Sequence, residues 1–503
     1  MSFATLAAVV WLPLLALLGG VFSGGAAANG RIMVDLGDVH RLAILGRSIF
    51  IALCAAAAGT LFGLVPGYAA FCEEARGRSL IVLAMTFPLL IPPFVHALSW
   101  IALFDWFGAS LSGFGPTVLI LALSFSPVAA LLTFAGLLNV QGSTSDAAFL
   151  ARPPLAVFRR IHLRLIEPHL WTAFLLIALF SLSDYGVPSL LRVNTYPVIV
   201  FSEFAACYDL RGAILSAWPY LVLPAAALVL WRCRVARRLF ETVQGQGELA
   251  RPRGPIAGSP FWRIGFVVFF VFAALLPIAS LVVTAGGASS YVSAWRTASA
   301  QLVRSLGYAL LSASLMTMIA IVVGFGLRAS SKMSNVIQDY TSLLPIGVPG
   351  TLYGVGLIAL WNHSGTALVY GSTAMLVFLY LSRFSPFAVR ALLVGREQIG
   401  RDVLDAARLS HASNARILRR IVLPLVAPSA VAGWCLCTVL CLRELAGTLL
   451  VSPPGTETLA VRIYSLYHYG AGKLVAALSL VLVGTSMGVL AVAVLLARKV
   501  RPC

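Results

Sequence analysis

Long apolar stretches recur along the whole chain, and they constrain its fold more than any other feature. About a dozen of them approach the ~20 residues that a helix needs to cross a bilayer. They cover residues 3–23, 47–70, 79–103, 115–138, 169–187, 213–231, 264–287, 304–327, 338–361, 368–393, 426–446 and 474–497. The 503 residues are 60% hydrophobic and only 11% charged, with a mean hydropathy of +0.93, which is too apolar for a soluble fold. The sequence therefore predicts an all-α, multi-pass membrane protein with about 12 transmembrane helices.

The two halves of the sequence repeat each other. Matching residues lie 257 to 260 positions apart, and they include Arg47-Ser48 and Arg304-Ser305, Pro88 and Pro345, Pro92 and Pro349, Asp146 and Asp405, and Asp184 and Glu444. Each half holds six predicted spans, so both have the same membrane orientation and form parallel six-helix repeats. We place the halves at residues 1–231 and 263–503, joined by a polar cytoplasmic linker at 232–262.

Prolines interrupt the third and ninth predicted spans. They are Pro88, Pro92, Pro93, Pro345 and Pro349. A proline within a bilayer helix has no N–H, so a backbone carbonyl one turn earlier needs another partner, from a neighbouring helix or a water-lined cavity. Two interpretations stay open: a kink for packing, or a helix that lines a translocation path.

Net charge is +18, and its distribution indicates orientation rather than nucleic-acid binding. If both termini are cytoplasmic, most basic residues fall in cytoplasmic segments or at their membrane ends, and Arg383 is counted among them. This asymmetry follows the positive-inside rule. No Lys or Arg precedes Arg31, so we expect the first apolar run to be retained as a membrane anchor rather than cleaved. A nucleic-acid partner is not required, whereas a lipid bilayer is.

A polar, Arg-rich segment at residues 405–424 lies between two of the last apolar runs. Asp402 is a plausible N-cap for a short helix there, and Asp405 lies in its first turn, where negative charge is stabilised. Arg408, Arg416 and Arg419 share the polar side of the segment. Such a helix would lie along the cytoplasmic membrane surface and contact something outside the bilayer.

This segment resembles a known family signature. Asp405-Ala406-Ala407, then Ala412-Ser413, then Ile421, Leu423 and Pro424, are similar to the EAA motif of the membrane subunits of binding-protein-dependent ABC importers. The resemblance implies a type I importer permease (MetI-like) fold and a coupling helix that docks on a separate cytoplasmic ATPase. It also implies a periplasmic solute-binding protein. Asp405 stands where the family usually has Glu, and His411 where it has Gly, which affects the turn that ends the helix.

The first half carries a more divergent counterpart at residues 146–164, which begins Asp146-Ala147-Ala148. Arg152 takes the usual Gly place, and Pro153-Pro154 would still end the first helix there. Two such loops in one chain imply docking sites for an ATPase dimer.

Charges after the fifth and eleventh spans suggest candidates for the outer mouth of a pathway: Asp184, Arg443 and Glu444. A charge at bilayer depth is costly and needs a reason. The alternative is that these residues lie near the periplasmic interface and pair with one another or with water.

The sequence around Arg443-Glu444, through Pro453-Pro454-Gly455, also looks like the ferric iron branch of these importers, whose permeases are fused two-half chains. Fused permeases for thiamine, aminoethylphosphonate or polyamines share this architecture. An ion-coupled secondary transporter is a further alternative, but it would not need two Asp-Ala-Ala loops.

Sequence signatures of an enzyme do not appear. Gly470-Ala471-Gly472-Lys473 lacks the spacing and the Ser or Thr of a phosphate-binding loop, so we expect ATP hydrolysis on another polypeptide and no cofactor. The cysteines show no zinc-type spacing, and we expect no metal site. His96, His169 and His363 lie near the ends of predicted spans and are interpreted as interfacial residues. The sequence thus predicts a non-enzymatic permease of the bacterial inner membrane.

Overall fold

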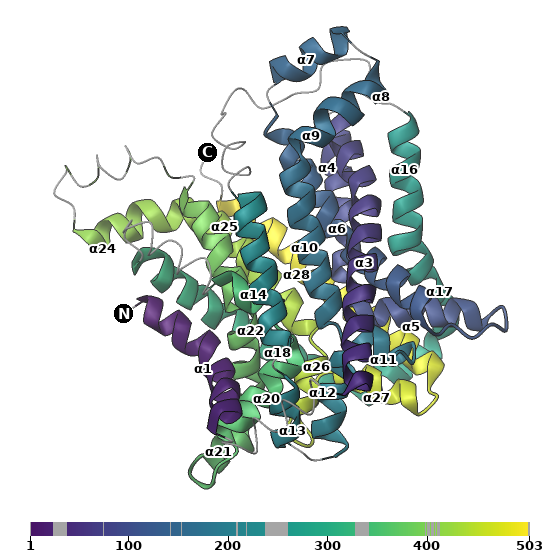
Figure 1. Ribbon diagram of the computed structural model, residues 1–503, viewed down its shortest axis with the longest axis vertical. Coiled ribbons are helices and arrows are strands. Elements are labelled where there is room, and N and C mark those ends of the chain that lie inside the picture. The colour runs from purple at the N-terminus through teal and green to yellow at the C-terminus, as the bar shows by residue number, and fades with distance from the viewer. Residues whose placement is uncertain are drawn as a thin grey trace. The chain divides into compact units, whose positions relative to one another are not determined.

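The computed structural model describes residues 2–23, 38–73, 75–140, 142–151, 153–207, 210–217, 219–236, 260–326, 342–397, 399, 403, 407, 409 and 413–500. Every regular element within these ranges is a helix (Figure 1), as the sequence predicts. Among the described residues, eight helices are long and apolar enough to cross a membrane, or up to ten if each of two sharply bent pairs counts as one span. Shorter apolar helices at Ala8–Gly19 and Gly350–Trp361 fall in the first and ninth predicted spans. The protein is therefore an all-α polytopic membrane protein, and the count of twelve spans stays a prediction.

The chain forms two compact units. Unit 1 comprises Met1–Val34, Val200–Trp218 and Gly287–Cys503, and unit 2 comprises Asp35–Ile199 and Pro219–Gly286. The elements of unit 2 are α3 (Val39–Cys72), α4 (Ala75–Thr86), η1 (Phe87–Leu90), α5 (Pro93–Asp105), α6 (Phe114–Leu138), α7 (Gly142–Ala151), α8 (Pro154–Val157), η2 (Phe158–His162), α9 (Leu163–Leu165), α10 (Glu167–Ser183), α11 (Gly186–Leu190), α14 (Pro219–Trp231), η3 (Arg232–Ala236), α16 (Pro260–Phe270), η4 (Val271–Leu275) and α17 (Leu276–Ala285).

Unit 1 is built from three separate parts of the chain. Its elements are α1 (Ser2–Ser23), α13 (Leu210–Ser216), α18 (Ala288–Gly326), η5 (Leu344–Gly347), α20 (Gly350–Trp361), η6 (Ser364–Thr366), α21 (Ala367–Tyr370), α22 (Ala374–Glu397), α24 (Asn414–Ile417), η7 (Leu418–Val422), α25 (Leu423–Leu442), α26 (Ala446–Val451), α27 (Leu459–His468) and α28 (Gly472–Val500). Helix α12 (Tyr196–Ala205) runs across the boundary between the two units.

The first helix of each sequence half belongs to the compact unit of the other half. Helix α1 packs against α20, α18 and α22 in unit 1, whereas α16 packs against α3, and α17 against α5, in unit 2. The predicted halves at 1–231 and 263–503 describe the repeat along the sequence, and the compact units do not follow that division. Most of the predicted linker, residues 237–259, lies outside the described residues.

Unit 2 has its closest helix packing between α3 and α6. Gly59, Gly63 and Gly67 follow one another at intervals of one turn on α3, so they share one face. A Cβ on Gly63 would lie 2.6 Å from the Cβ of Ala129 and 2.7 Å from the backbone N of Ala130. Because these three glycines have no side chains, the backbones of α3 and α6 can approach closely, as in other small-residue interfaces in membranes.

Equivalent prolines form the same 3₁₀ turn before a helix in both units. In unit 2 the 3₁₀ turn η1 ends at Ile91, whose N–H donates to the carbonyl of Pro88 (3.2 Å), and α5 starts after Pro92. The helical segments on either side of this break are bent by 87°. In unit 1 the N–H of Val348 donates to the carbonyl of Pro345, also at 3.2 Å, before α20 starts. The repeated prolines thus form the same turn and the same helix start in both units.

The serine of the repeated Arg-Ser pair has the same structural role in both units. The hydroxyl of Ser48 on α3 accepts the N–H of Tyr196 at the start of α12 (2.9 Å). The hydroxyl of Ser305 on α18 accepts the N–H of Leu459 at the start of α27 (2.7 Å). Each serine satisfies one of the first N–H groups of a helix, which have no partner within that helix.

Candidate functional site

Two carboxylates cap the short helices that follow α10 and α25. In unit 2, Asp184 Oδ1 accepts the N–H of Val187 in α11, at 2.8 Å. In unit 1, Glu444 Oε1 accepts the N–H of Gly447 in α26, at 2.9 Å. The first N–H groups of a helix attract negative charge, so the repeated carboxylates stabilise the same helix start in each unit.

Glu444 has a second partner that the sequence did not reveal. Its Oε2 accepts a hydrogen bond from Nη1 of Arg383, and the two side chains form an ion pair. The Glu444 side chain is only 6% exposed, and that of Arg383 is 19% exposed. Burying both charges is costly and is compensated only by their close contact and by further hydrogen bonds such as the one from Gly447.

Arg383 corrects one expectation from the sequence. It was counted among the basic residues at the cytoplasmic membrane ends, but it lies inside the membrane-length helix Ala374–Glu397 and pairs with Glu444. The predicted span ended at residue 393, before the end of α22 at Glu397, and this placed Arg383 too near its cytoplasmic end. An Arg in the middle of a largely apolar span was the signal that could have indicated a buried partner.

Two glycines make room for the ion pair. A Cβ on Gly350, the first residue of α20, would clash with Nη1 of Arg383 and with Oε1 of Glu444. A Cβ on Gly447 would lie 2.7 Å from the carbonyl oxygen of Gly350. The start of the broken helix α20 therefore lies directly against the ion pair and the start of α26.

The two units differ at this place. By the register of the repeat, Gly350 corresponds to Pro93 and Gly447 to Val187. Ser385-Pro386 on α22 corresponds to Ser126-Pro127 on α6, which puts Ser124 where unit 1 has Arg383. The ion pair therefore belongs to unit 1, although the carboxylate cap occurs in both units.

The remaining candidate of this group, Arg443, ends α25 and is partly buried. Asp184, Arg443 and Glu444 were expected to pair with one another or with water. Glu444 instead forms an ion pair with Arg383. Asp184 belongs to unit 2, where it caps α11.

Histidines expected at the interface are mostly buried. His96 is 1% exposed and His169 6% exposed, whereas His363 is exposed. His96 contacts the carbonyl of Ala273 and the hydroxyl of Ser124, and His169 packs against Gly136. The interfacial interpretation is therefore wrong for His96 and His169, because helix packing within unit 2 covers both rings.

Residues 146–164, the first of the two segments expected to contact an ATPase (the first coupling segment), begin within helix α7. Ala147 is exposed, Ala148 is buried, and Leu150 is 92% exposed. The side chain of Asp146 and the whole of Arg152 lie outside the described residues. Leu150 is a single exposed apolar side chain on this helix, and such residues are common on protein surfaces.

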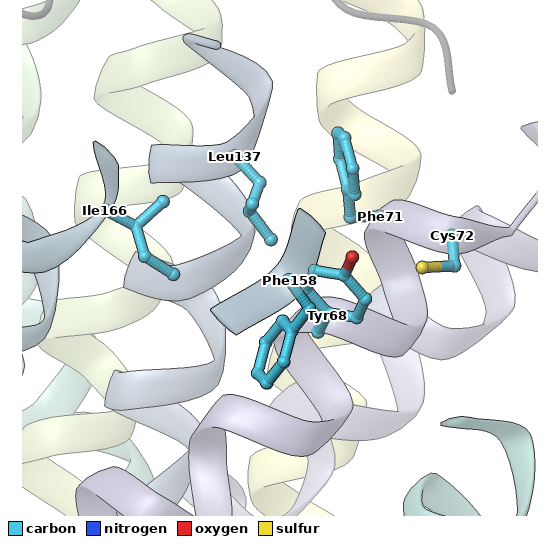
Figure 2. Packing of buried hydrophobic residues seen from close by; sticks show 6 residues of the cluster. All are labelled: Tyr68, Phe71, Cys72, Leu137, Phe158 and Ile166. Atoms are coloured by element: carbon cyan, nitrogen blue, oxygen red, sulfur yellow. The ribbon is translucent and has the colours of Figure 1, made fainter. Parts of the chain in front are cut away.

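An aromatic cluster connects this segment to the helices of unit 2. Figure 2 shows its buried members, which are Tyr68, Phe71 and Cys72 of α3, Leu137 of α6, Phe158 and Ile166. Phe149 of α7 and Trp262 of α16 pack against them. The hydroxyl of Tyr68 is 3.0 Å from Nδ1 of the buried His162. Helices α7, α3 and α16 therefore all contribute side chains to one packed cluster.

A π-helical turn follows both coupling segments at the same place in the repeat. It spans Phe158–His162 in unit 2 and Leu418–Val422 in unit 1. The turn buries Phe158 and His162 while Arg159 and Arg160 remain exposed. In unit 1, Leu418 and Val422 take the places of Phe158 and His162, so the aromatic cluster has no exact counterpart there.

The second coupling segment is described only in part. Asp405, Ala406 and His411 lie outside the described residues. Ala407 is buried, Ile421 and Leu423 are partly buried, and Pro424 is exposed in the first turn of α25. Pro424, which has no N–H to donate, comes two residues after the π-helical turn Leu418–Val422.

Comparison with known proteins connects these features to transport. Residues 316–502 match the family described as "Binding-protein-dependent transport system inner membrane component". The chain is 25% identical over 405 residues to the Fe(3+)-transport system permease protein FbpB 2 of Haemophilus influenzae, an alignment that covers 77% of each chain. It is 21% identical over 453 residues to the ferric transport system permease protein FbpB of Actinobacillus pleuropneumoniae, covering 81% of this chain and 64% of that protein. It is 30% identical over 150 residues to the spermidine/putrescine transport system permease protein PotC of Escherichia coli, covering 30% of this chain and 56% of PotC.

Proposed function

We propose that this chain, whose residues 316–502 belong to the inner-membrane components of binding-protein-dependent transport systems, is the permease subunit of an ATP-binding-cassette importer for ferric iron. One observation carries the assignment of the solute. The similarity to a ferric iron permease extends over 77% of both chains, whereas that to the polyamine permease covers 30% of this chain. A fused, two-half permease agrees with the duplication seen in the sequence.

The partners follow from the family and from the two coupling segments. A periplasmic binding protein would deliver the solute to the outer face. An ATPase dimer would bind residues 146–164 and 405–424 on the cytoplasmic side, with both termini of the chain also in the cytoplasm. The exposed Leu150 and the exposed Arg159, Arg160, Arg419 and Arg420 support this assignment, since they leave one apolar and several basic side chains accessible at these segments.

Within the permease, the broken helices α5 and α20 are the best candidates to line the pathway. Asp184, Arg443 and Glu444 are candidates for its outer mouth. The position of Glu444 against the start of α20 supports this role, because a change in the ion pair with Arg383 would move the break itself. Uptake by a Glu444→Gln variant, normalised to the amount of folded protein, tests this role.

Deletion of this chain is expected to abolish ATP-dependent uptake of ferric iron. Labelled ferric iron, thiamine, aminoethylphosphonate and spermidine would be compared in cells with and without the chain, before and after ATP depletion. Normal iron uptake with loss of another solute would keep the permease assignment and overturn the iron assignment. Uptake that persists without ATP would overturn the importer class.

Reversing the charge at Asp405 is expected to uncouple transport. An Asp405→Lys variant should lower uptake by about tenfold or more, because truncating or reversing an interfacial charge typically costs several kcal/mol. The amount of protein in the membrane should remain unchanged. Glu397→Lys is a matched control, since Glu397 is exposed at the end of α22 and makes the same change in net charge outside the motif. Equal uptake by both variants would contradict a coupling role for Asp405.

A further inference from the structure

Helix α1 contains a proline that leaves one backbone carbonyl in need of a donor. In an α-helix each carbonyl accepts the N–H four residues later. Residue 13 is proline, so it has no N–H to donate to the carbonyl of Val9. The hydroxyl of Ser382 on α22 takes its place and donates to the carbonyl of Val9 at 2.8 Å. Ser382 is 3% exposed, so its hydroxyl is shielded from water.

The same turn of α1 lies against a glycine of the broken helix α20. A Cβ on Gly356 would lie 2.5 Å from the carbonyl oxygen of Pro13 and 3.2 Å from Cγ of Leu17. The backbones of α1 and α20 therefore approach each other at the proline turn, next to the hydrogen bond from Ser382. Two independent features therefore meet at one turn of α1: the hydroxyl donor of Ser382 and the absence of a side chain at Gly356.

Unit 2 repeats this arrangement with different residues. Pro277 of α17 has no N–H for the carbonyl of Ala273, four residues earlier. Nε2 of His96 on α5 is 3.1 Å from that carbonyl, and Nδ1 of His96 is 3.1 Å from the hydroxyl of Ser124. A neutral imidazole protonated on Nε2 satisfies both contacts, since it donates to Ala273 and accepts from Ser124.

A reciprocal hydrogen bond strengthens the contact in unit 2. The hydroxyl of Ser280 on α17 donates to the carbonyl of Ser99 on α5, at 2.7 Å. By the register of the repeat, Ser99 corresponds to Gly356. The proline turn of the first helix of each half therefore meets the same turn of a broken helix in both units.

We propose that Ser382 and His96 are positioning residues, each of which supplies the hydrogen bond that a proline removes. Ser382 of α22 holds the proline turn of α1 where that turn meets α20, and His96 of α5 holds α17 against α5. A carbonyl in hydrocarbon without a donor is unfavourable, so the hydrogen bond from the neighbouring side chain stabilises the proline turn and its contact. Any effect of these contacts on transport rests on the proposed permease function, whereas the helix contacts themselves do not depend on it.

The test in unit 1 is a double-mutant cycle on the full chain in lipid nanodiscs, read by amide hydrogen exchange. Ser382→Ala is expected to speed exchange in α1 and α20 by about tenfold, the factor expected from loss of one buried hydrogen bond. Pro13→Ala restores an N–H to the turn, so Ser382→Ala should have no effect in that background. Ser385→Ala is the matched control, because Ser385 lies one turn later on α22 and donates to Leu381 of its own helix.

The corresponding cycle in unit 2 uses His96→Leu and Pro277→Ala. His96→Leu should speed exchange in α5 and α17 and leave α1 unchanged, and Pro277→Ala should remove that effect. His96→Gln should retain slow exchange, because a Gln amide can donate to Ala273. Unchanged exchange in Ser382→Ala and His96→Leu would overturn the proposal, and so would equal acceleration by Ser385→Ala or a failure of either proline substitution to compensate. The hydrogen-exchange measurements need no substrate, so their outcome is independent of the outcome of the uptake experiment.

Discussion

Replacing Glu444 by Gln is expected to destabilise the protein by about 3–5 kcal/mol, the usual cost of removing one partner from a buried ion pair. The Gln side chain keeps a carbonyl oxygen that can accept the N–H of Gly447, so the cap of α26 remains. The guanidinium of Arg383 would stay buried without its counter-charge. The loss therefore reports the ion pair rather than the cap.

A second variant separates these two effects. Arg383→Met combined with Glu444→Gln removes both charges, and it should recover most of the stability that Glu444→Gln alone loses. Asp184→Asn is the control for the cap, because Asp184 caps α11 in the same way and Ser124 stands where unit 1 has Arg383. Thermal unfolding in detergent measures all three variants. Equal stability of the single and the double variant would contradict this prediction, because it would mean that the buried charge of Arg383 costs no stability without Glu444.

Gly63→Leu is expected to prevent unit 2 from folding. Even a Cβ at residue 63 would clash with the carbonyl oxygen of Ser126 and lie 2.7 Å from the backbone N of Ala130. Backbone atoms of α6 cannot rotate away as a side chain can, so the two helices would have to separate. Overpacking typically costs about 1–3 kcal/mol, and the contact with backbone puts this substitution at or above about 3 kcal/mol.

The measurement is the amount of monodisperse protein recovered from membranes. Gly307→Leu on α18 is the matched control, because a Cβ there meets nothing within 4 Å. Gly59→Ala should have a smaller effect than Gly63→Ala, since its Cβ would lie 3.1 Å from the nearest atom, the carbonyl oxygen of Ala122. Normal recovery of Gly63→Leu would mean that α3 and α6 do not need their close approach.

The sequence predicted those features that depend on local chemistry. Apolar length located the membrane helices, and the spacing of Pro88 and Pro92 against Pro345 and Pro349 located both breaks. These signals are reliable because a proline has the same effect on any bilayer helix, whatever packs beside it.

Features that depend on partners far along the chain were missed. Arg383 and Glu444 are 61 residues apart, and neither one indicates the other. Gly59, Gly63 and Gly67 carried a visible four-residue spacing, but only the structure shows that α6 faces them. The attachment of α1 to unit 1 had no signal at all, because an apolar helix in a bilayer presents similar surfaces to lipid and to several possible neighbours.

The exchange of first helices between the two units has a consequence for the order of synthesis. Helix α1 (Ser2–Ser23) is synthesised well before α20 (Gly350–Trp361) and α22 (Ala374–Glu397), which it contacts. Unit 1 therefore cannot be completed until α20 and α22 have been inserted. Until then α1 remains in the lipid without these neighbours. A single polypeptide ensures that the waiting helix always meets a partner from its own chain, in a ratio of one to one.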